Sequence, residues 1–221
     1  MSNRTKGSAL KGSRYWMQHF VNTPDVARLN ANIQAADPSV TGITWLSPLR
    51  TDDYVEWKAK EIPGITSDNL AFWPELGPLW DAVGTFDKEG ILLVEAKAHC
   101  GEIGSSCTAS SSHSLALIHT ALENTYQHIA HGRSFTPEQK HIWLTEQYQM
   151  ANRLAFLHHF RQQGKNVRLL LLCFANDYTH NPTTTAELRV YTEEQVWMRM
   201  TGQKTAPDGV LEVYLEVPDP T

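Results

Sequence analysis

The spacing of apolar and polar residues changes several times along the chain. Between Tyr15 and Ala36 apolar positions recur at a loosely helical spacing, which is interrupted at Thr23-Pro24,. Thr23 suits an N-cap and Pro24 the first helical position, so a helix is predicted from Pro24 to Ala36. The stretch from Val40 to Pro78 is rich in glycine and proline, and it predicts only a short helix near Asp52 to Lys60,.

Two neighbouring strands are predicted next. The residues from Trp80 to Phe86 form one strand, and the near-continuous apolar run from Ile91 to Ala98 forms a second strand that is buried on both faces,. A three-residue loop, Lys88-Glu89-Gly90, is expected to join them, with the glycine in a left-handed conformation. This register places Asp81 opposite Lys97 and Val83 opposite Glu95.

The second half of the chain alternates between helical and strand-like patterns. A small-polar loop, residues 104–114, precedes a predicted helix from Leu115 to His131,. Thr136 as N-cap and Pro137 at the first position begin another helix, which runs to about Gln163 and ends before Gly164. Buried strands are predicted at Val167 to Ala175 and at Val210 to Val217. The pattern predicts one mixed α/β domain, residues 14–221, behind a polar and flexible N-terminal arm, residues 1–13.

Composition narrows the class of protein. A chain of 221 residues with 41% apolar residues is typical of one globular domain,. It contains no run of about 18 apolar residues and no secretory signal, so a cytoplasmic protein that does not bind membranes is expected. The three cysteines are an odd number, which favours reduced thiols,. Cys173 lies in an apolar run and is expected in the core, and the four tryptophans between positions 45 and 80 are expected to pack an irregular region.

The net charge of −5 gives no overall attraction to nucleic acid, so any such binding must use a local basic patch,. The sequence offers two candidate patches. The N-terminal set consists of Arg4, Lys6, Lys11 and Arg14, and the later set consists of Arg153, Arg161, Lys165 and Arg168. Each set is also compatible with an ordinary solvated surface.

Charged residues at the end of the second strand are the best candidates for chemistry. Side chains alternate along a strand, so Glu95 and Lys97 share one face, and the predicted register adds Asp81 to it. An apolar strand does not hold such charges without compensation. A bound Mg²⁺ or Mn²⁺ would supply it, because hard cations prefer carboxylate and carbonyl oxygens. The alternative is a salt bridge between Lys97 and one of the two carboxylates.

The segments Trp80-Asp81-Ala82-Val83-Gly84 and Leu92-Leu93-Val94-Glu95-Ala96-Lys97 resemble the signature of the PD-(D/E)XK phosphodiesterase superfamily. The resemblance implies a restriction-endonuclease-like αβββαβ core, with a mixed central sheet flanked by helices. It also implies that Asp81, Glu95 and the backbone carbonyl of Ala96 ligate the metal, while Lys97 activates water and stabilises the transition state. The proline of the motif is replaced here by Trp80, although Pro78 is close.

Further candidates surround this set. Glu102 follows Lys97 by five residues and is expected to reach the metal or to cap a loop, and Glu56 and Glu61 offer further carboxylates. Exonuclease-type members of the superfamily carry Gln and Tyr four residues apart on the next helix. Here Tyr148 directly precedes Gln149, with Arg153 one turn later, so these three are expected as neighbours of the site or as surface polar residues. A zinc site is the weaker interpretation of a Cys/His set whose spacing matches no closed pattern; its members are His99, Cys100, Cys107 and His113,.

The expected function is therefore hydrolysis of backbone phosphates in nucleic acid, most simply DNA, by an Mg²⁺- or Mn²⁺-dependent nuclease, with a homodimer as a possible assembly. Two alternatives stay open. The fold would serve as a nucleic-acid-binding or assembly module without activity, or the enzyme would act on another phosphorylated substrate.

Overall fold

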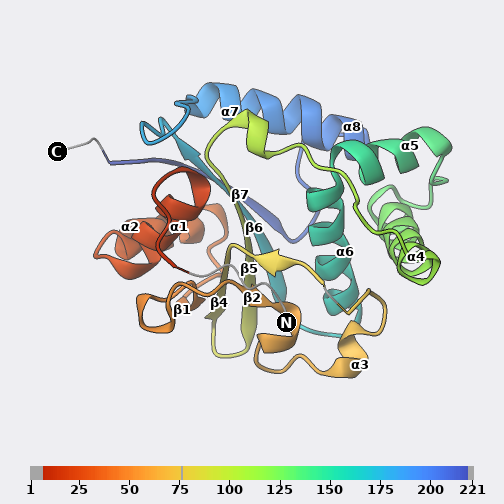
Figure 1. The fold of residues 1–221 in the computed structure, drawn as a ribbon, viewed down its shortest axis with the longest axis horizontal. Coiled ribbons are helices and arrows are strands. Elements are labelled where there is room, and N and C mark those ends of the chain that lie inside the picture. The colour runs from red at the N-terminus through yellow and green to blue at the C-terminus, as the bar shows by residue number, and fades with distance from the viewer. Residues whose placement is uncertain (1–6, 76, 219–221) are drawn as a thin grey trace.

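A five-stranded mixed sheet forms the centre of the molecule in the computed structural model, which describes residues 7–75 and 77–218 (Figure 1). The strand order is β1-β4-β5-β6-β7. β1, β4 and β5 pair antiparallel, whereas β6 runs parallel to β5, and β7 parallel to β6. The strands span β1 Thr44–Ser47, β4 Ala82–Phe86, β5 Gly90–Lys97, β6 Val167–Ala175 and β7 Val210–Glu216. The predicted mixed sheet flanked by helices is confirmed.

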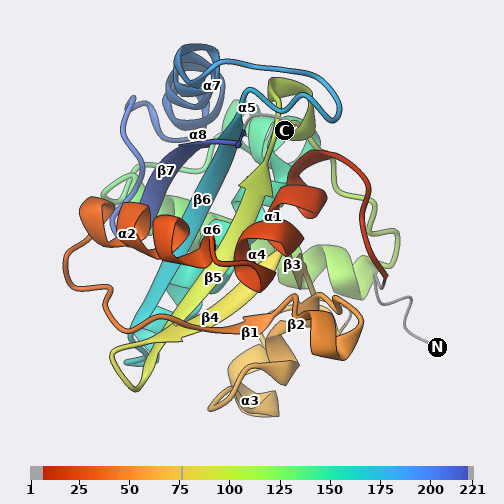
Figure 2. The same ribbon diagram turned by 90° about the vertical axis from the view of Figure 1, so that its left-hand side faces the viewer.

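Helices cover both faces of this sheet. α1 (Gly12–Asn22) and α2 (Val26–Ala36) lie across one face, as Figure 2 shows, and their buried positions include Phe20 and Ile33. On the other face α6 (Tyr148–Gln162) and α7 (Thr185–Tyr191) pack against the sheet, and α4 (Ser112–Ile129) packs on the outer side of α6. The molecule thus has two apolar cores, one on each side of the sheet.

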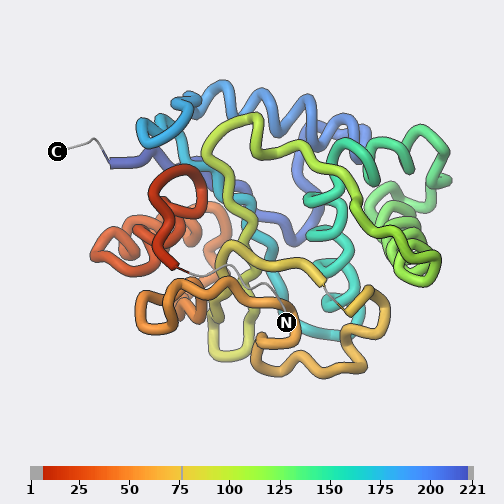
Figure 3. The backbone as a smooth tube through the Cα atoms, viewed as in Figure 1, coloured from red at the N-terminus to blue at the C-terminus, as the bar shows by residue number. Residues whose placement is uncertain are grey.

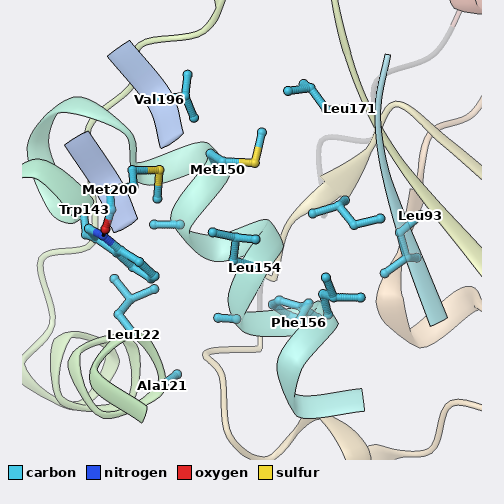
Figure 4. Packing of buried hydrophobic residues seen from close by; sticks show 14 of the residues in the cluster. Leu93, Ala121, Leu122, Trp143, Met150, Leu154, Phe156, Leu171, Val196 and Met200 are labelled. Atoms are coloured by element: carbon cyan, nitrogen blue, oxygen red, sulfur yellow. Dashed lines mark hydrogen bonds between the residues drawn. The ribbon is translucent and has the colours of Figure 1, made fainter. Parts of the chain in front are cut away.

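β5 contributes to both cores because its side chains alternate in direction. Leu92, Val94 and Ala96 pack towards α1 and α2, whereas Ile91 and Leu93 pack towards α6. In Figure 4, Met150, Leu154 and Phe156 of α6 lie between the sheet and the more distant helices. This two-sided burial explains the nearly uninterrupted apolar run that predicted the strand, and it leaves positions 95 and 97 on the α6 side.

The hairpin register differs from the prediction by two residues. Val83 lies opposite Leu93 rather than Glu95, and Phe86 lies opposite Gly90. Asp87 and Lys88, not Gly90, take the left-handed conformation, so the loop is Asp87-Lys88-Glu89. A shift of two residues keeps every side chain on its predicted face, since the strand repeat is two.

The predicted strand 80–86 is broken at Asp81. β3 (Leu79–Trp80) leaves the main sheet and pairs with β2 (Trp57–Lys58) in a separate two-stranded ribbon. The helix predicted for 52–60 is wrong, because Asp53 and Tyr54 have positive φ angles, which an α-helix does not allow,. That region contains β2 between two short 3₁₀ turns, Arg50–Asp52 and Ala59–Glu61.

The long helix predicted to begin at Pro137 is divided. α5 (Pro137–His141) continues as a π-helical turn, Ile142–Glu146, and ends at Gln147 before α6 begins. Gln147 forms an isolated bridge with Ser105, whose N–H donates to the Glu146 carbonyl at 2.8 Å. The connection from β5 to α4 therefore runs beside this break, a path that can be followed in Figure 3. The remaining short elements are α3 Ser67–Leu70, a 3₁₀ turn Cys100–Glu102, a π-helical turn Thr192–Met198 and α8 Arg199–Thr201.

Several other predictions can be compared with the structure. The bounds predicted for β6 are confirmed, and Cys173 is fully buried. Trp45, Trp73 and Trp80 are buried as expected. α1 begins at Gly12, before the predicted start of the domain at Arg14. Part of the predicted arm also contacts the domain, since the Gly7 N–H donates to the Asp53 carbonyl at 2.9 Å. Residues 1–6 of the predicted arm lie outside the described residues. Within the described ranges, no helix has the length and apolar character needed to cross a bilayer.

Candidate functional site

The candidate residues meet where β4 is interrupted and β5 ends. The Ala96 N–H donates to Oδ2 of Asp81 at 2.7 Å. This bond takes the place of the strand partner that β4 would otherwise offer, because regular pairing stops at Ala82 opposite Val94. In an antiparallel ladder the N–H and C=O of one residue point to the same side, so the Ala96 carbonyl also faces the break.

Glu95 is the centre of a buried ion-pair network. Its side chain is 0% exposed, its Oε1 lies 2.5 Å from Nζ of Lys97, and its Oε2 lies 2.6 Å from Nε of Arg153. An unpaired carboxylate would be very costly at this depth, and the two cations stabilise its charge. The strand pattern predicts Lys97 here, whereas Arg153 has no specific partner predicted from the sequence. The four-residue spacing of Gln149 and Arg153 on one helix face was the available signal.

Both cations are themselves held in place. Nζ of Lys97 donates to Oε1 of Gln149 at 2.9 Å, and the lysine side chain is 6% exposed. Arg153 donates through Nη2 to the Leu79 carbonyl at 2.7 Å and lies over the Trp80 ring, with 4.7 Å between its Cζ and the ring centroid. β3, β5 and α6 therefore fix the network from three directions.

The charges of these groups follow from burial and from their neighbours. Burial raises the pKa of Asp81 to about 8, and the nearby charge of Glu95 acts in the same direction. For Glu95 the burial effect is overcome by Arg153 and then by Lys97, so its pKa lies below the ordinary value. Glu95 and Asp81 in turn raise the pKa of Lys97. At neutral pH the site thus holds an ionised Glu95, two cations and a largely protonated Asp81.

Of the further carboxylates, Glu56 is the one near the site. Its charge also raises the pKa of Asp81, its Oε1 lies 3.2 Å from Nε of Arg14, and the residue is 7% exposed. Glu61 instead accepts from the Lys58 N–H at 2.8 Å, which is a local cap of a 3₁₀ turn. Glu56 therefore acts on the charge of the site, whereas Glu61 has a local structural role.

The remaining candidates lie around the network. Glu102 accepts from the Ala98 N–H at 2.8 Å and so closes the turn after β5, as one of its two predicted roles required. Tyr148 packs towards Cys107 on the β5–α4 connection; burial and then this thiol raise its pKa. Of the two neighbours Tyr148 and Gln149, it is Gln149 that bonds directly to the network, as the acceptor for Lys97.

The donor set matches the coordination chemistry of Mg²⁺ or Mn²⁺ with two carboxylates and one carbonyl. Mg²⁺ commonly binds one or two carboxylates and keeps its other positions for water and phosphate oxygens. Among the described residues, no group of three or more His, Cys, Asp or Glu side chains is arranged to hold a metal ion. This also applies to the set His99, Cys100, Cys107 and His113. Among the described residues the geometry therefore offers no closed zinc site.

The later basic set does not form a continuous positive surface. Arg153 is buried against Glu95, Arg161 pairs with Asp208 at 2.7 Å, and Arg168 pairs with Asp37 at 2.9 Å. In the N-terminal set Arg14 pairs with Glu56, while Arg4 and Lys6 lie outside the described residues. Lys11 is exposed just before α1.

Comparisons with protein-family models, with curated proteins and with solved structures find no match to this chain.

Proposed function

We propose that the protein is a divalent-metal-dependent phosphodiesterase that hydrolyses the backbone of nucleic acid, most simply DNA. One observation carries the proposal: Asp81 bonds to the backbone of Ala96 directly beside Glu95 and Lys97, so two carboxylates, a carbonyl and an ammonium lie together at a break in the sheet. Such a set provides both cation ligands and a group that can stabilise a phosphate.

Each residue has a separate role in this proposal. Asp81, Glu95 and the Ala96 carbonyl would hold Mg²⁺ or Mn²⁺, which when bound polarises the phosphate and lowers the pKa of water. Lys97 donates towards the attacked phosphate and stabilises the negative charge that develops on it. Gln149 orients Lys97, because it accepts one of the three ammonium protons at 2.9 Å. Arg153 keeps Glu95 ionised and fixed.

A bound divalent cation would increase the attraction of the site for a phosphate. With Asp81 ionised, its charge and that of Glu95 would cancel those of Lys97 and Arg153, and no net attraction to a phosphate would remain. Asp81 instead favours a proton up to about pH 8. A divalent cation that displaces this proton gives the site a net charge of about +2, which suits an anionic backbone.

The order of elements is a second line of support. Helices α1 and α2 precede the antiparallel β1, β4 and β5, and helices then lead to the parallel β6. This order is compatible with the αβββαβ core that the resemblance to the PD-(D/E)XK superfamily implies. In such a core the motif would place Asp81, at the break, beside Glu95 and Lys97, at the end of β5.

Plasmid hydrolysis tests the proposal. The protein is incubated with supercoiled DNA and Mn²⁺, and nicking is expected, with loss of at least about 100-fold in Lys97→Met, which keeps the length of the side chain. Lys60→Met, at an exposed position, is the control and should keep the activity. Hydrolysis of bis(p-nitrophenyl) phosphate without any nicking would indicate a different phosphorylated substrate.

The closed ion-pair network favours a second candidate, a nucleic-acid-binding or assembly module without activity. Lys97 and Arg153 pair with the two carboxylate oxygens of Glu95, so the network alone accounts for its burial. In that case wild-type protein and Lys97→Met would both bind DNA in a gel-shift experiment and neither would nick it. Nicking that requires Lys97 excludes the module as the sole function.

A further inference from the structure

A cavity of about 670 Å³ lies on the α6 side of the sheet, between the C-terminal parts of α4 and α6 and the segment that leads into β7. Its volume falls within the roughly 300–1,000 Å³ of typical small-molecule sites. The basic end of the cavity is separate from the candidate metal site: Gln149 and Arg161 are about 18 Å apart along α6 at a rise of 1.5 Å per residue,.

The lining combines an apolar side with several basic groups. Leu154 and Leu157 of α6 are buried at the cavity. The imidazoles of His128 and His158 lie across the helix pair, with ring centroids 4.3 Å apart and planes inclined by 33°. Arg161 reaches the same space from one turn beyond His158.

The basic groups outnumber the acidic ones. α4 contributes His128 to the cavity, the turn after α4 contributes His131, and α6 contributes His158 and Arg161. Among the described residues that line the cavity, Asp208 is the only one with a carboxylate, and it is paired with Arg161. Burial lowers the pKa of His158 to about 4, and the charges of His128, His159 and Arg161 act in the same direction. An anion placed among these groups would remove their mutual repulsion and stabilise protonated imidazoles.

The ends of the two helices add to this arrangement. The Gly132 N–H bonds to the Gln127 carbonyl, and the Lys165 N–H bonds to that of Phe160, so terminal carbonyls of α4 and α6 are satisfied by their own chain,. The partial negative charge of helix C-termini favours protonated histidines there. The same partial charge opposes an anion, so Arg161 and the protonated imidazoles have to offset it.

We propose that this cavity is a binding site for a small organic phosphate, such as a nucleoside monophosphate, distinct from the candidate metal site. Arg161 and the imidazoles of His128 and His158 donate to the phosphate oxygens, while Leu154 and Leu157 contact the apolar part of the ligand. Guanidinium and imidazolium groups make charge-assisted hydrogen bonds with phosphate, which are stronger than those between neutral groups.

Titration of the full chain with adenosine monophosphate and with inorganic phosphate tests the proposal. The chain is labelled at its histidines, and the Cε1–H resonances are followed by NMR. The resonances of His128 and His158 are expected to shift, and the pKa of His158 should rise by about one unit or more once the ligand is bound. A merely structural histidine would show no such ligand-dependent titration.

Two variants and a control complete the experiment. Arg161→Gln and His131→Gln alter accessible groups of the cavity, and Arg161→Gln should weaken the binding of adenosine monophosphate by at least about tenfold. His119→Gln, an exposed position of α4 outside the lining, should bind as wild type does. The proposal is overturned if neither probe shifts His128 or His158 up to roughly 10 mM, or if Arg161→Gln binds unchanged. Neither result bears on the metal site, which this experiment leaves unaltered.

Discussion

Nε of Arg153 lies 2.6 Å from Oε2 of Glu95, although the two residues are 58 positions apart in the chain. The pair joins α6 to β5 and is almost completely removed from solvent, with side-chain exposures of 4% and 0%. It keeps Glu95 ionised and oriented towards Lys97. The geometry of the site therefore depends on α6 as well as on β5.

Removal of Arg153 tests this structural role. Arg153→Met would leave Glu95 buried with Lys97 as its single partner, so the free energy of unfolding should fall by about 3 kcal/mol. Urea denaturation measures the change. In a Glu95→Gln background the same substitution should cost much less, because no carboxylate charge is left unpaired. Arg161→Met, which removes a more exposed ion pair, should cost no more than about 1 kcal/mol, and equal losses at both arginines would contradict the role,.

The titration of Asp81 should appear in the pH dependence of stability. Its folded pKa of about 8 lies above its ordinary value of 3.8, so between these values the folded state binds more protons than the unfolded state,. The stability that this group contributes is therefore present at low pH and is lost as pH rises towards about 8. Urea denaturation of wild type and Asp81→Asn across this range measures the effect, because the titrations of groups remote from Asp81 are common to both. A wild-type advantage that grows with pH would show the sign to be wrong.

The hairpin register can be tested at Gly90. A Cβ at this position would lie 2.6 Å from the ring of Phe86, which is 1% exposed and has no room to move. Gly90→Ala should destabilise the protein by about 1–3 kcal/mol. Gly104→Ala, whose Cβ would meet the Glu146 carbonyl at an ordinary 3.6 Å, is the control. In a Phe86→Leu background the cost of Gly90→Ala should be smaller, and an unchanged cost would contradict the observed pairing.

The role of Gln149 as a positioning residue leads to a kinetic prediction. Gln149→Met removes one acceptor of the Lys97 ammonium and should lower kcat for Mn²⁺-dependent hydrolysis by about tenfold, with KM nearly unchanged,. Its pH–rate profile should shift relative to wild type, because Lys97 loses a hydrogen bond to its charged form. Gln127→Met, at an exposed position of α4, is the matched control. An unaltered kcat and pH profile would contradict this positioning role of Gln149.

Elements defined by local sequence were predicted well. β6 has its predicted bounds because an uninterrupted apolar run lies between Gly164 and the polar residues that follow Ala175. The face shared by Glu95 and Lys97 follows from the two-residue repeat of a strand, which no tertiary contact can alter. The mixed α/β class followed from the order of these elements, and the mixed sheet flanked by helices followed from the family resemblance.

Features that depend on distant contacts were not predicted. β3 separates from β4 because it pairs with β2, more than twenty residues earlier in the chain. The hairpin register was displaced because Asp87 and Lys88 adopt left-handed conformations that glycine would adopt more readily,. Arg153 was named as a neighbour of the site, but its bond to Glu95 depends on how α6 lies over the sheet. The catalytic roles of these residues stay predictions.

Calorimetric titration with Mn²⁺ tests the central claim, that Asp81 and Glu95 hold a divalent cation, most directly. At about pH 7 the wild-type protein should bind Mn²⁺ and release close to one proton per ion, measured in two buffers of different ionisation enthalpy, because the ion displaces the proton of Asp81,. Asp81→Asn should lose at least about tenfold in affinity, a typical effect of removing one ligand charge. Asp87→Asn, in the exposed hairpin loop, should bind as wild type does. Absence of Mn²⁺ binding by the wild-type protein, or binding that Asp81→Asn leaves unchanged, would contradict the claim.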